Sequence, residues 1–319
     1  MAIEPRIDAY GKDADGSLLA DYVELLARAG DSLSQADLAD LITDNEWKVR
    51  SRELITVPQD LVRDPDEEPS QDAVEGELIE DPGLEAAMWV FELLTERAET
   101  LGDRYPFEVE GVRLRALETE PRHGPYLVLL SITVAHAYAL DTGHNPRTMF
   151  EETVARVLEG RVSRTVNMGA MGREGGNFPQ ALRDAGEALG LHVAPGAVPH
   201  RTHAQELGVD TISHLHWSDS RPGRWAFIGQ ATCAKTERWP QKMGEPTPGN
   251  WGPMLGTLVA PIPYLAVPHH AEEHHMAQIT TDRRVLLLDR LRLCNHLEEP
   301  SDAERALVAA VLAEQVVRP

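Results

Sequence analysis

Apolar residues recur three and four positions apart near the start of the chain, over 16–30 and again over 31–45. This spacing predicts two amphipathic helices, the first ending at Gly30 and the second capped by Ser34. A helical pair of this size is compatible with a helix-turn-helix module. A module that reads DNA needs a basic second helix, however, and this one is acidic, so a plain helical hairpin over 1–57 is predicted.

A second group of apolar stripes follows between residues 84 and 145. Helical spacing over 84–102 predicts a helix that ends at Gly102. Residues 107–118 alternate in polarity and predict a small β-hairpin. The apolar run over 125–140 is too short to cross a bilayer and predicts a buried helix. Region 84–145 is therefore expected to be helical, with one small hairpin.

The pattern changes after residue 145, where segments of helical spacing alternate with segments typical of strands. The predicted elements are helices over 146–160, 178–190 and 302–317, a glycine-rich loop over 167–179, and strands over 208–217, 224–232 and 283–293. The tetrapeptide RPGR is expected to turn the chain between the first two strands. This alternation indicates an α/β domain over 146–319, with a mixed central sheet flanked by helices.

Charge divides the chain unevenly. The 319 residues carry a net charge of −22, and residues 1–121 hold 31 of the 52 acidic side chains but only 11 of the 30 basic ones. Within this acidic part, the proline-rich segment 58–83 is predicted to be a linker. The overall charge argues against nonspecific binding of nucleic acid by the whole protein, but it leaves room for a local binding groove.

Two further features concern the compartment. The first ten residues, MAIEPRIDAY, lack the apolar segment of a secretory signal, and the two cysteines, Cys233 and Cys294, make no disulfide framework. We therefore expect a cytoplasmic protein that is not inserted in a membrane.

The candidate chemistry lies between residues 146 and 245. Only four of the 30 basic residues are lysines, and two of them, Lys235 and Lys242, follow the strand that ends near Gln230. Asp210 opens the preceding strand, and Glu151 lies on the first helix of the α/β region. Carboxylate and amide oxygens suit a divalent cation that activates water, and an ammonium group can orient that water or stabilise developing charge. A hairpin returns Gln230 to the neighbourhood of Asp210.

Three short motifs in this order, MFEETVARVL on a helix, GVD opening a strand and GQ late in the next strand, resemble the PD-(D/E)xK nuclease superfamily. The Mrr-like restriction endonucleases are the branch they resemble most, and the resemblance covers roughly residues 146–245. It implies a restriction-endonuclease-like core that hydrolyses DNA phosphodiesters with Mg²⁺ or Mn²⁺, in bacterial restriction or anti-phage defence. The metal ligands it implies are Glu151, Asp210 and Gln230.

The chain departs from this motif at one position. The family places a lysine two residues after the Glu or Gln, and here that residue is Thr232. Lys235, with Lys242 as the second candidate, is expected to supply the missing ammonium. The resemblance also implies a homo-oligomer or a partner protein. The uneven charge, and not the resemblance, suggests that the acidic N-terminal third keeps the nuclease off DNA. The alternative is a catalytically inactive scaffold with the same fold, acting in a defence or regulatory complex.

A cluster of histidines offers a competing metal site. In PHHAEEHH, over 268–275, His270 and His274 are four residues apart and could bind zinc from one face of a helix. The sequence is not HExxH, and Pro268 favours a loop or a helix start. An exposed loop is therefore the prediction for this segment.

Overall fold

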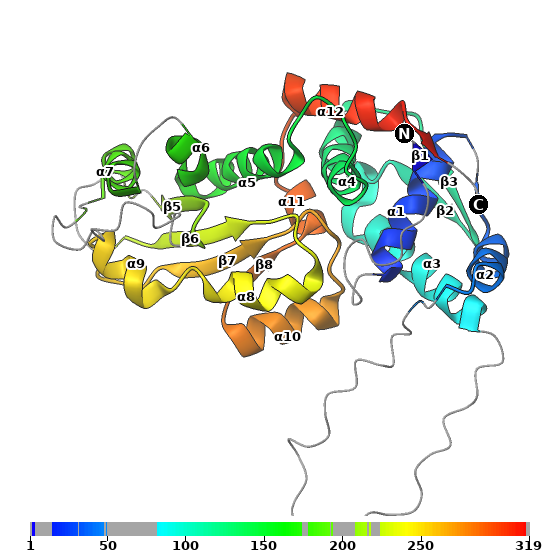
Figure 1. The fold of residues 1–319 in the computed structure, drawn as a ribbon, viewed down its shortest axis with the longest axis horizontal. Coiled ribbons are helices and arrows are strands. Elements are labelled where there is room, and N and C mark those ends of the chain that lie inside the picture. Colours follow the sequence, from blue (N-terminus) through cyan, green and yellow to red (C-terminus); the bar gives the residue numbers. More distant parts are fainter. Residues whose placement is uncertain are drawn as a thin grey trace, which may run out of the picture.

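The computed structural model describes residues 2–3, 15–30, 32–47, 49, 82–173, 178–191, 193, 208–215, 217 and 224–316. Figure 1 shows a mainly helical region next to an α/β region built on a five-stranded sheet. Within the described residues, none of the helices has the length and apolar composition that a bilayer crossing requires.

The helical region contains the elements predicted for the first half of the chain. These are α1 (Asp15–Arg28), α2 (Gln35–Asp44), α3 (Pro82–Leu101), α4 (Gly124–Ala137) and the antiparallel pair β2 (Phe107–Glu110) and β3 (Arg113–Ala116), with short 3₁₀ turns at Gly102–Arg104 and Pro121–His123. The predicted cap of α2 is confirmed, since Ser34 Oγ accepts the Asp37 N–H at 3.1 Å and Asp37 Oδ2 accepts the Ser34 N–H at 2.9 Å. The predicted linker lies outside the described residues, except for 82–83 at the start of α3.

The sheet of the α/β region is mixed, as the sequence predicts. Its strand order is β4 (Ser163–Asn167), β5 (Thr211–Leu215), β6 (Ala226–Ala231), β7 (Ile262–Ala266) and β8 (Leu286–Leu288). The pairs β4–β5 and β5–β6 are antiparallel, whereas β6–β7 and β7–β8 are parallel. The predicted hairpin is thus present as β5 and β6, although the RPG of its turn lies outside the described residues.

Helices cover both faces of this sheet. The long helix α5 (Pro146–Val162) lies along one face, and α8 (Trp239–Gly244) and α10 (Glu273–Arg283) lie along the other (Figure 1). Also packed on the sheet region are α7 (Phe178–Leu189), α9 (Pro248–Met254) and the short α6 (Met168–Arg173). Side chains alternate between the faces, so that Ile228 packs in one core with Trp251, whereas Tyr264 packs in another with Phe150.

Two strands of this sheet, β4 and β7, were not predicted. β4 follows α5 without a break. Its segment, SRTVN, is mostly polar, and Val166 is the side chain that it buries in the core, so the sequence carries little sign of a strand. β7 contains Pro263, which argues against a central strand. However, β8 pairs only with Tyr264–Ala266, so Pro263 lies where β7 has a single neighbour.

Three other predictions were wrong in part. The helix expected over 302–317 ends at Leu312, and residues 315–316 form a strand. The glycine-rich segment forms α6 over Met168–Arg173, and residues 174–177 lie outside the described part. The predicted strand over 283–293 is shorter, since β8 ends at Leu288. Asp289 then caps α11 (Arg290–Cys294) by accepting the Arg292 N–H at 3.0 Å, which turns the chain from strand into helix.

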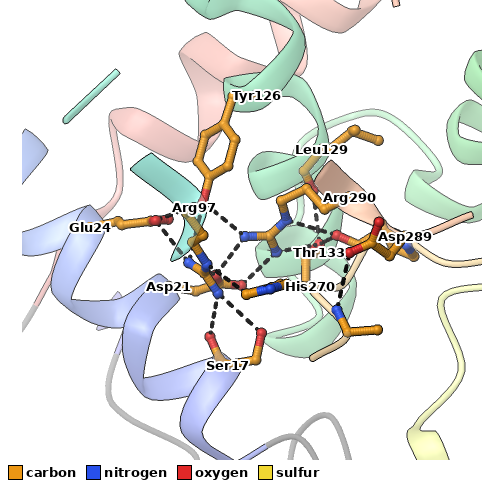
Figure 2. Close-up of polar contacts among 12 residues, drawn as sticks. Ser17, Asp21, Glu24, Arg97, Tyr126, Leu129, Thr133, His270, Asp289 and Arg290 are labelled. Carbon is orange, nitrogen blue, oxygen red and sulfur yellow. Dashed lines mark hydrogen bonds and ion pairs between the residues drawn. The ribbon is translucent and has the colours of Figure 1, made fainter. Parts of the chain in front are cut away.

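The end of the chain packs on the helical region and not on the sheet. α11 and α12 (Asp302–Leu312) contact α4, and β9 (Gln315–Val316) pairs in parallel with β1 (Ala2–Ile3). Figure 2 shows a buried polar cluster at this junction, with Arg290 of α11 beside Asp21 of α1 and Arg97 of α3. The domain boundary predicted after residue 145 stays a prediction, but a shared core crosses it.

Candidate functional site

One cleft gathers the five residues that the sequence singled out for nuclease chemistry. Glu151, Asp210, Gln230, Lys235 and Lys242 line a cavity of about 660 Å³, which we call the candidate cleft. The other residues that line it are His136, Arg147, Ala231, Thr232, Cys233, Ala234 and Arg238. Side chains from α4, α5, the start of β5, the end of β6 and α8 therefore meet at one place, although up to 106 residues separate them in sequence.

Asp210 is fixed between two strands. Its N–H donates to the carbonyl of Gly229 at 2.9 Å, and its Oδ2 accepts the N–H of Ala231 at 2.8 Å. Its own carbonyl accepts the N–H of Met168 at 2.8 Å, which ties the same residue to the end of β4. Asp210 therefore sits at the junction of three strands, and the end of β6 sets the orientation of its carboxylate.

Gln230 occupies the next-to-last position of β6 and is only 4% exposed. Its Nε2 donates to Oε2 of Glu245, the residue that follows α8. The same carboxylate oxygen accepts from Nζ of Lys242 at 3.0 Å. Sequence reasoning missed Glu245. The one sequence signal for Glu245 was its spacing from Lys242, since side chains of opposite charge three residues apart on a helix can form an ion pair.

Gly208 makes room for this arrangement. Its φ of +68° is in the left-handed region, which favours glycine. A Cβ at this position would lie 2.3 Å from Glu245 Cβ and 2.9 Å from Gln230 Nε2. The glycine of the GVD motif is therefore needed both for its backbone conformation and because Glu245 packs directly against it.

Basic side chains surround the candidate cleft. Arg147, Lys235 and Arg238 are exposed, and Lys242 is about one-third exposed. His136 is half-buried, and its pKa is lowered by burial first and by the charge of Arg147 second, which favours the neutral ring. Sequence reasoning did not single out Arg147, Arg238 or His136. His136 and Arg147 lie on α4 and α5, which precede the strand motifs, whereas Arg238 lies in the 3₁₀ turn Thr236–Arg238 that follows β6.

A larger cavity of about 780 Å³ lies along α3 near the start of α10 and has the opposite character. Its charged lining is entirely glutamate, at positions 92, 96, 99, 272 and 273. A polyanion such as nucleic acid is repelled by such a wall. Of these two cavities, the candidate cleft is the one whose charge suits a phosphate-bearing ligand.

Cys233 lines the candidate cleft but is not suited to act as a nucleophile. Its side chain is 5% exposed, and burial raises the pKa of its thiol well above the ordinary value. A thiol is reactive as the thiolate, which burial disfavours. Cys233 therefore acts as a small apolar residue of the core.

The exposed loop predicted over 268–275 was wrong at its first histidines. His269 and His270 are 1% and 3% exposed, because they follow the buried strand β7. The helix α10 begins only at Glu273, so His270 lies outside it and does not share a helical face with His274. The zinc site considered for His270 and His274 required both residues on one helix, and this condition is not met.

The donor set of the candidate cleft fits one kind of metal ion. The carboxylates of Asp210 and Glu151 and the amide of Gln230 offer oxygen ligands, which Mg²⁺ and Mn²⁺ prefer. Across the residues that the structure describes, no three His, Cys, Asp or Glu side chains are grouped closely enough to hold a metal ion. Mg²⁺ is often bound by one or two carboxylates, with water and substrate phosphate completing its shell. The cleft therefore fits a site that the substrate helps to complete, and not a cage built by protein alone.

Neither protein-family models, nor curated proteins, nor solved structures gave a match to this chain.

Proposed function

We propose that the protein is a metal-dependent nuclease whose active site is the candidate cleft, within a restriction-endonuclease-like α/β core. The observation that carries this proposal is the convergence of Glu151, Asp210 and Gln230 with a lysine in one cavity. These residues come from a helix, the start of one strand and the end of its antiparallel neighbour. That is the layout expected when the motifs of the PD-(D/E)xK type are placed on a folded chain.

The proposed metal is Mg²⁺ or Mn²⁺. Asp210 would be its principal ligand, Gln230 and a strand carbonyl would complete the protein's share of the shell, and Glu151 would assist from α5. When bound, such an ion lowers the pKa of a coordinated water and stabilises charge on a phosphoryl oxygen. The protein's own contribution is to hold these oxygens still, and the hydrogen bonds of Asp210 to β6 achieve this.

The proposed substrate is DNA. Phosphates on either side of the scissile bond would be bound by Arg147, Arg238 and Lys235, which surround the cleft. The near neutrality of residues 122–319 supports this role, because it limits the long-range repulsion between this half and a polyanion. An ammonium group in the cleft would orient the attacking water or stabilise the charge that develops on the phosphate.

The test is cleavage of supercoiled and linear DNA with Mg²⁺ or Mn²⁺ by wild type and by Asp210→Asn. Because the variant loses the charge of the principal ligand, we expect the cleavage rate to fall by about 100-fold or more. Asp302→Asn is the matched control, since that side chain is 98% exposed and does not line the cleft. Equal activity of wild type and Asp210→Asn would refute the proposal.

A second candidate is an inactive nuclease fold that binds DNA or a partner protein without cutting. The observation that favours it is Thr232, which lines the cleft where the motif has lysine and whose Oγ1 accepts the Ala234 N–H at 3.1 Å. DNA binding by wild type without cleavage in either metal, and unchanged by Asp210→Asn, would select this function. Work as an oligomer or inside a defence complex is compatible with both candidates.

A further inference from the structure

A single carboxylate oxygen joins two residues of the candidate cleft. Oε2 of Glu245 accepts from Nε2 of Gln230 and from Nζ of Lys242, the latter at 3.0 Å. Its other oxygen, Oε1, lies 3.3 Å from the same ammonium. The Lys242 ammonium is therefore one bridging atom away from the amide that ends β6. Glu245 itself does not line the cleft, so it contacts these two residues from outside the cavity.

The helix that carries this pair is anchored firmly to the sheet. Trp239 and Met243 of α8 are buried against Leu265 of β7 and Leu287 of β8. The indole Nε1 of Trp239 donates to the carbonyl of Ala234 at 3.0 Å, which fixes the start of the helix to the turn after β6. A site whose supporting residues stand on such an element keeps its geometry better than one on a free loop.

The two lysines of the cleft differ in how they are placed. Lys242 is about one-third exposed and is held against Glu245. Lys235 is exposed and precedes the short 3₁₀ turn Thr236–Arg238. A long side chain loses rotamer freedom when it is fixed, and an ion pair already made in the folded protein removes that cost before substrate arrives.

We propose that Glu245 is a positioning residue that holds Lys242 as the ammonium of the site and orients the amide of Gln230. Because the amide nitrogen of Gln230 is bonded to Glu245, its oxygen remains as the group to face a cation. Lys242 would then supply the positive charge that the motif normally takes from two residues after Gln230, and Lys235 would only bind substrate. This inference rests on the proposed nuclease function and assigns a role within that site.

The experiment compares steady-state cleavage of DNA with Mg²⁺ by full-length variants. We expect Lys242→Ala to lower kcat by about 100-fold, the size of effect that a positioned catalytic group gives. Lys235→Ala loses a phosphate contact, so we expect it to raise KM for DNA and to lower kcat much less than Lys242→Ala does. Lys242→Met, which keeps the apolar stem, is the second variant, and thermal melting checks that each protein folds. The reverse ranking of the two lysines would overturn the proposal.

Glu245 is tested through a double-mutant cycle. Glu245→Gln still accepts from Gln230 but loses the ion pair, so we expect kcat to fall about 10-fold while KM for DNA stays within about 2-fold. If Glu245 acts through Lys242, the same change adds nothing in the Lys242→Met background. Independent, additive effects would mean a general structural role and would overturn the proposal.

The outcomes separate this inference from the function on which it rests. Cleavage that is lost in Asp210→Asn but kept in Lys242→Met and Glu245→Gln would leave the nuclease function standing and overturn the role of this pair. A wild-type protein that cleaves no DNA with Mg²⁺ or Mn²⁺ would overturn both.

Discussion

Arg290 and Asp21 are separated by 269 residues in sequence and form a two-pronged ion pair in the interior, with N–O distances of 2.6 and 2.7 Å. Their side chains are 0% and 1% exposed. Figure 2 shows that Arg97 approaches the same carboxylate, and Arg97 in turn pairs with Glu24 at 2.8 Å. Tyr126 also donates to Glu24, at 2.6 Å. Helices from the two ends of the chain are thus joined by buried charges, and Arg290 also donates to the carbonyl of Pro268 at 2.9 Å.

Removing one member of this cluster should be costly. Arg290→Met keeps much of the side-chain volume but leaves the buried carboxylate of Asp21 short of one cation. We expect the free energy of unfolding to fall by about 3–5 kcal/mol, measured by urea denaturation, because an uncompensated buried charge remains. Arg305→Met is the control: its partner Asp302 is 98% exposed, and exposed pairs contribute little. Similar losses of unfolding free energy in both variants would show that removing the buried cation costs no more than removing an exposed one.

The same cluster bears on the acidic N-terminal third. Deleting residues 1–121 would remove Asp21 and leave the buried guanidinium of Arg290 without this carboxylate. Such a truncated protein would be destabilised, so it cannot test whether the acidic part repels DNA. Replacing the acidic residues of the predicted linker 58–83 by Asn and Gln leaves the cluster intact. We expect this variant to bind a labelled duplex more tightly at 50 mM salt, by fluorescence anisotropy, with the gain shrinking at about 200 mM because salt screens the repulsion. An unchanged affinity at low salt would contradict the repulsion hypothesis.

His269 should make stability depend on pH. It is buried, stacks on Trp239 with ring centroids 6.1 Å apart, and has its pKa lowered to about 3 by burial first and by Arg290 second. Since the unfolded chain binds this proton near pH 6.5 and the folded chain does not, the stabilisation is complete above pH 6.5 and is lost as the pH falls toward 3.

The measurement is urea denaturation at pH 7.5 and pH 5.5 for wild type and His269→Phe, which keeps the stacked ring. We expect wild type to lose about 1.4 kcal/mol more unfolding free energy than the variant between the two pH values. The reason is that pH 5.5 lies about one unit below the pKa of this histidine in the unfolded chain, which is protonated there while the folded chain is not. Carboxylates contribute equally to both proteins and cancel in the difference. A pH dependence that is identical in the two proteins would mean that His269 is not held neutral by the fold.

Local patterns were sufficient to predict much of the fold. The cap at Ser34 was correctly placed, because a capping box depends only on residues three positions apart. The hairpin of β5 and β6 followed from alternation with a turn signal between the strands. β4 and β7 were missed because a polar edge strand and a strand with proline carry weak periodicity, and what makes them strands is their pairing with β5 and β6.

The candidate site shows the same limit. Asp210 and Gln230 could be placed together because a hairpin fixes their separation, and both line the candidate cleft. Glu245 could not be found in this way, since its contact with Gln230 depends on how α8 packs on β7 and β8. The buried pair of Arg290 and Asp21 joins the two ends of the chain, and no spacing rule connects residues so far apart.

Two glycines with the same backbone conformation offer a matched test of the close contact behind the cleft. Gly208 and Gly111 have φ values of +68° and +61°, so alanine at either position costs about 1–2 kcal/mol for the left-handed conformation alone. At Gly111 a Cβ would meet nothing within 4 Å, whereas at Gly208 it would lie 2.3 Å from Glu245 Cβ.

We therefore expect Gly208→Ala to lose about 1–3 kcal/mol more than Gly111→Ala in urea denaturation, because the added methyl has to displace Glu245. If Glu245 positions Lys242 as proposed, Gly208→Ala should also cleave DNA more slowly under conditions in which both variants are fully folded, and Gly111→Ala should cleave like wild type. Equal stability losses in the two variants would show that Glu245 can move aside at no cost. The carboxylate would then be too loosely held to fix an ammonium in the cleft.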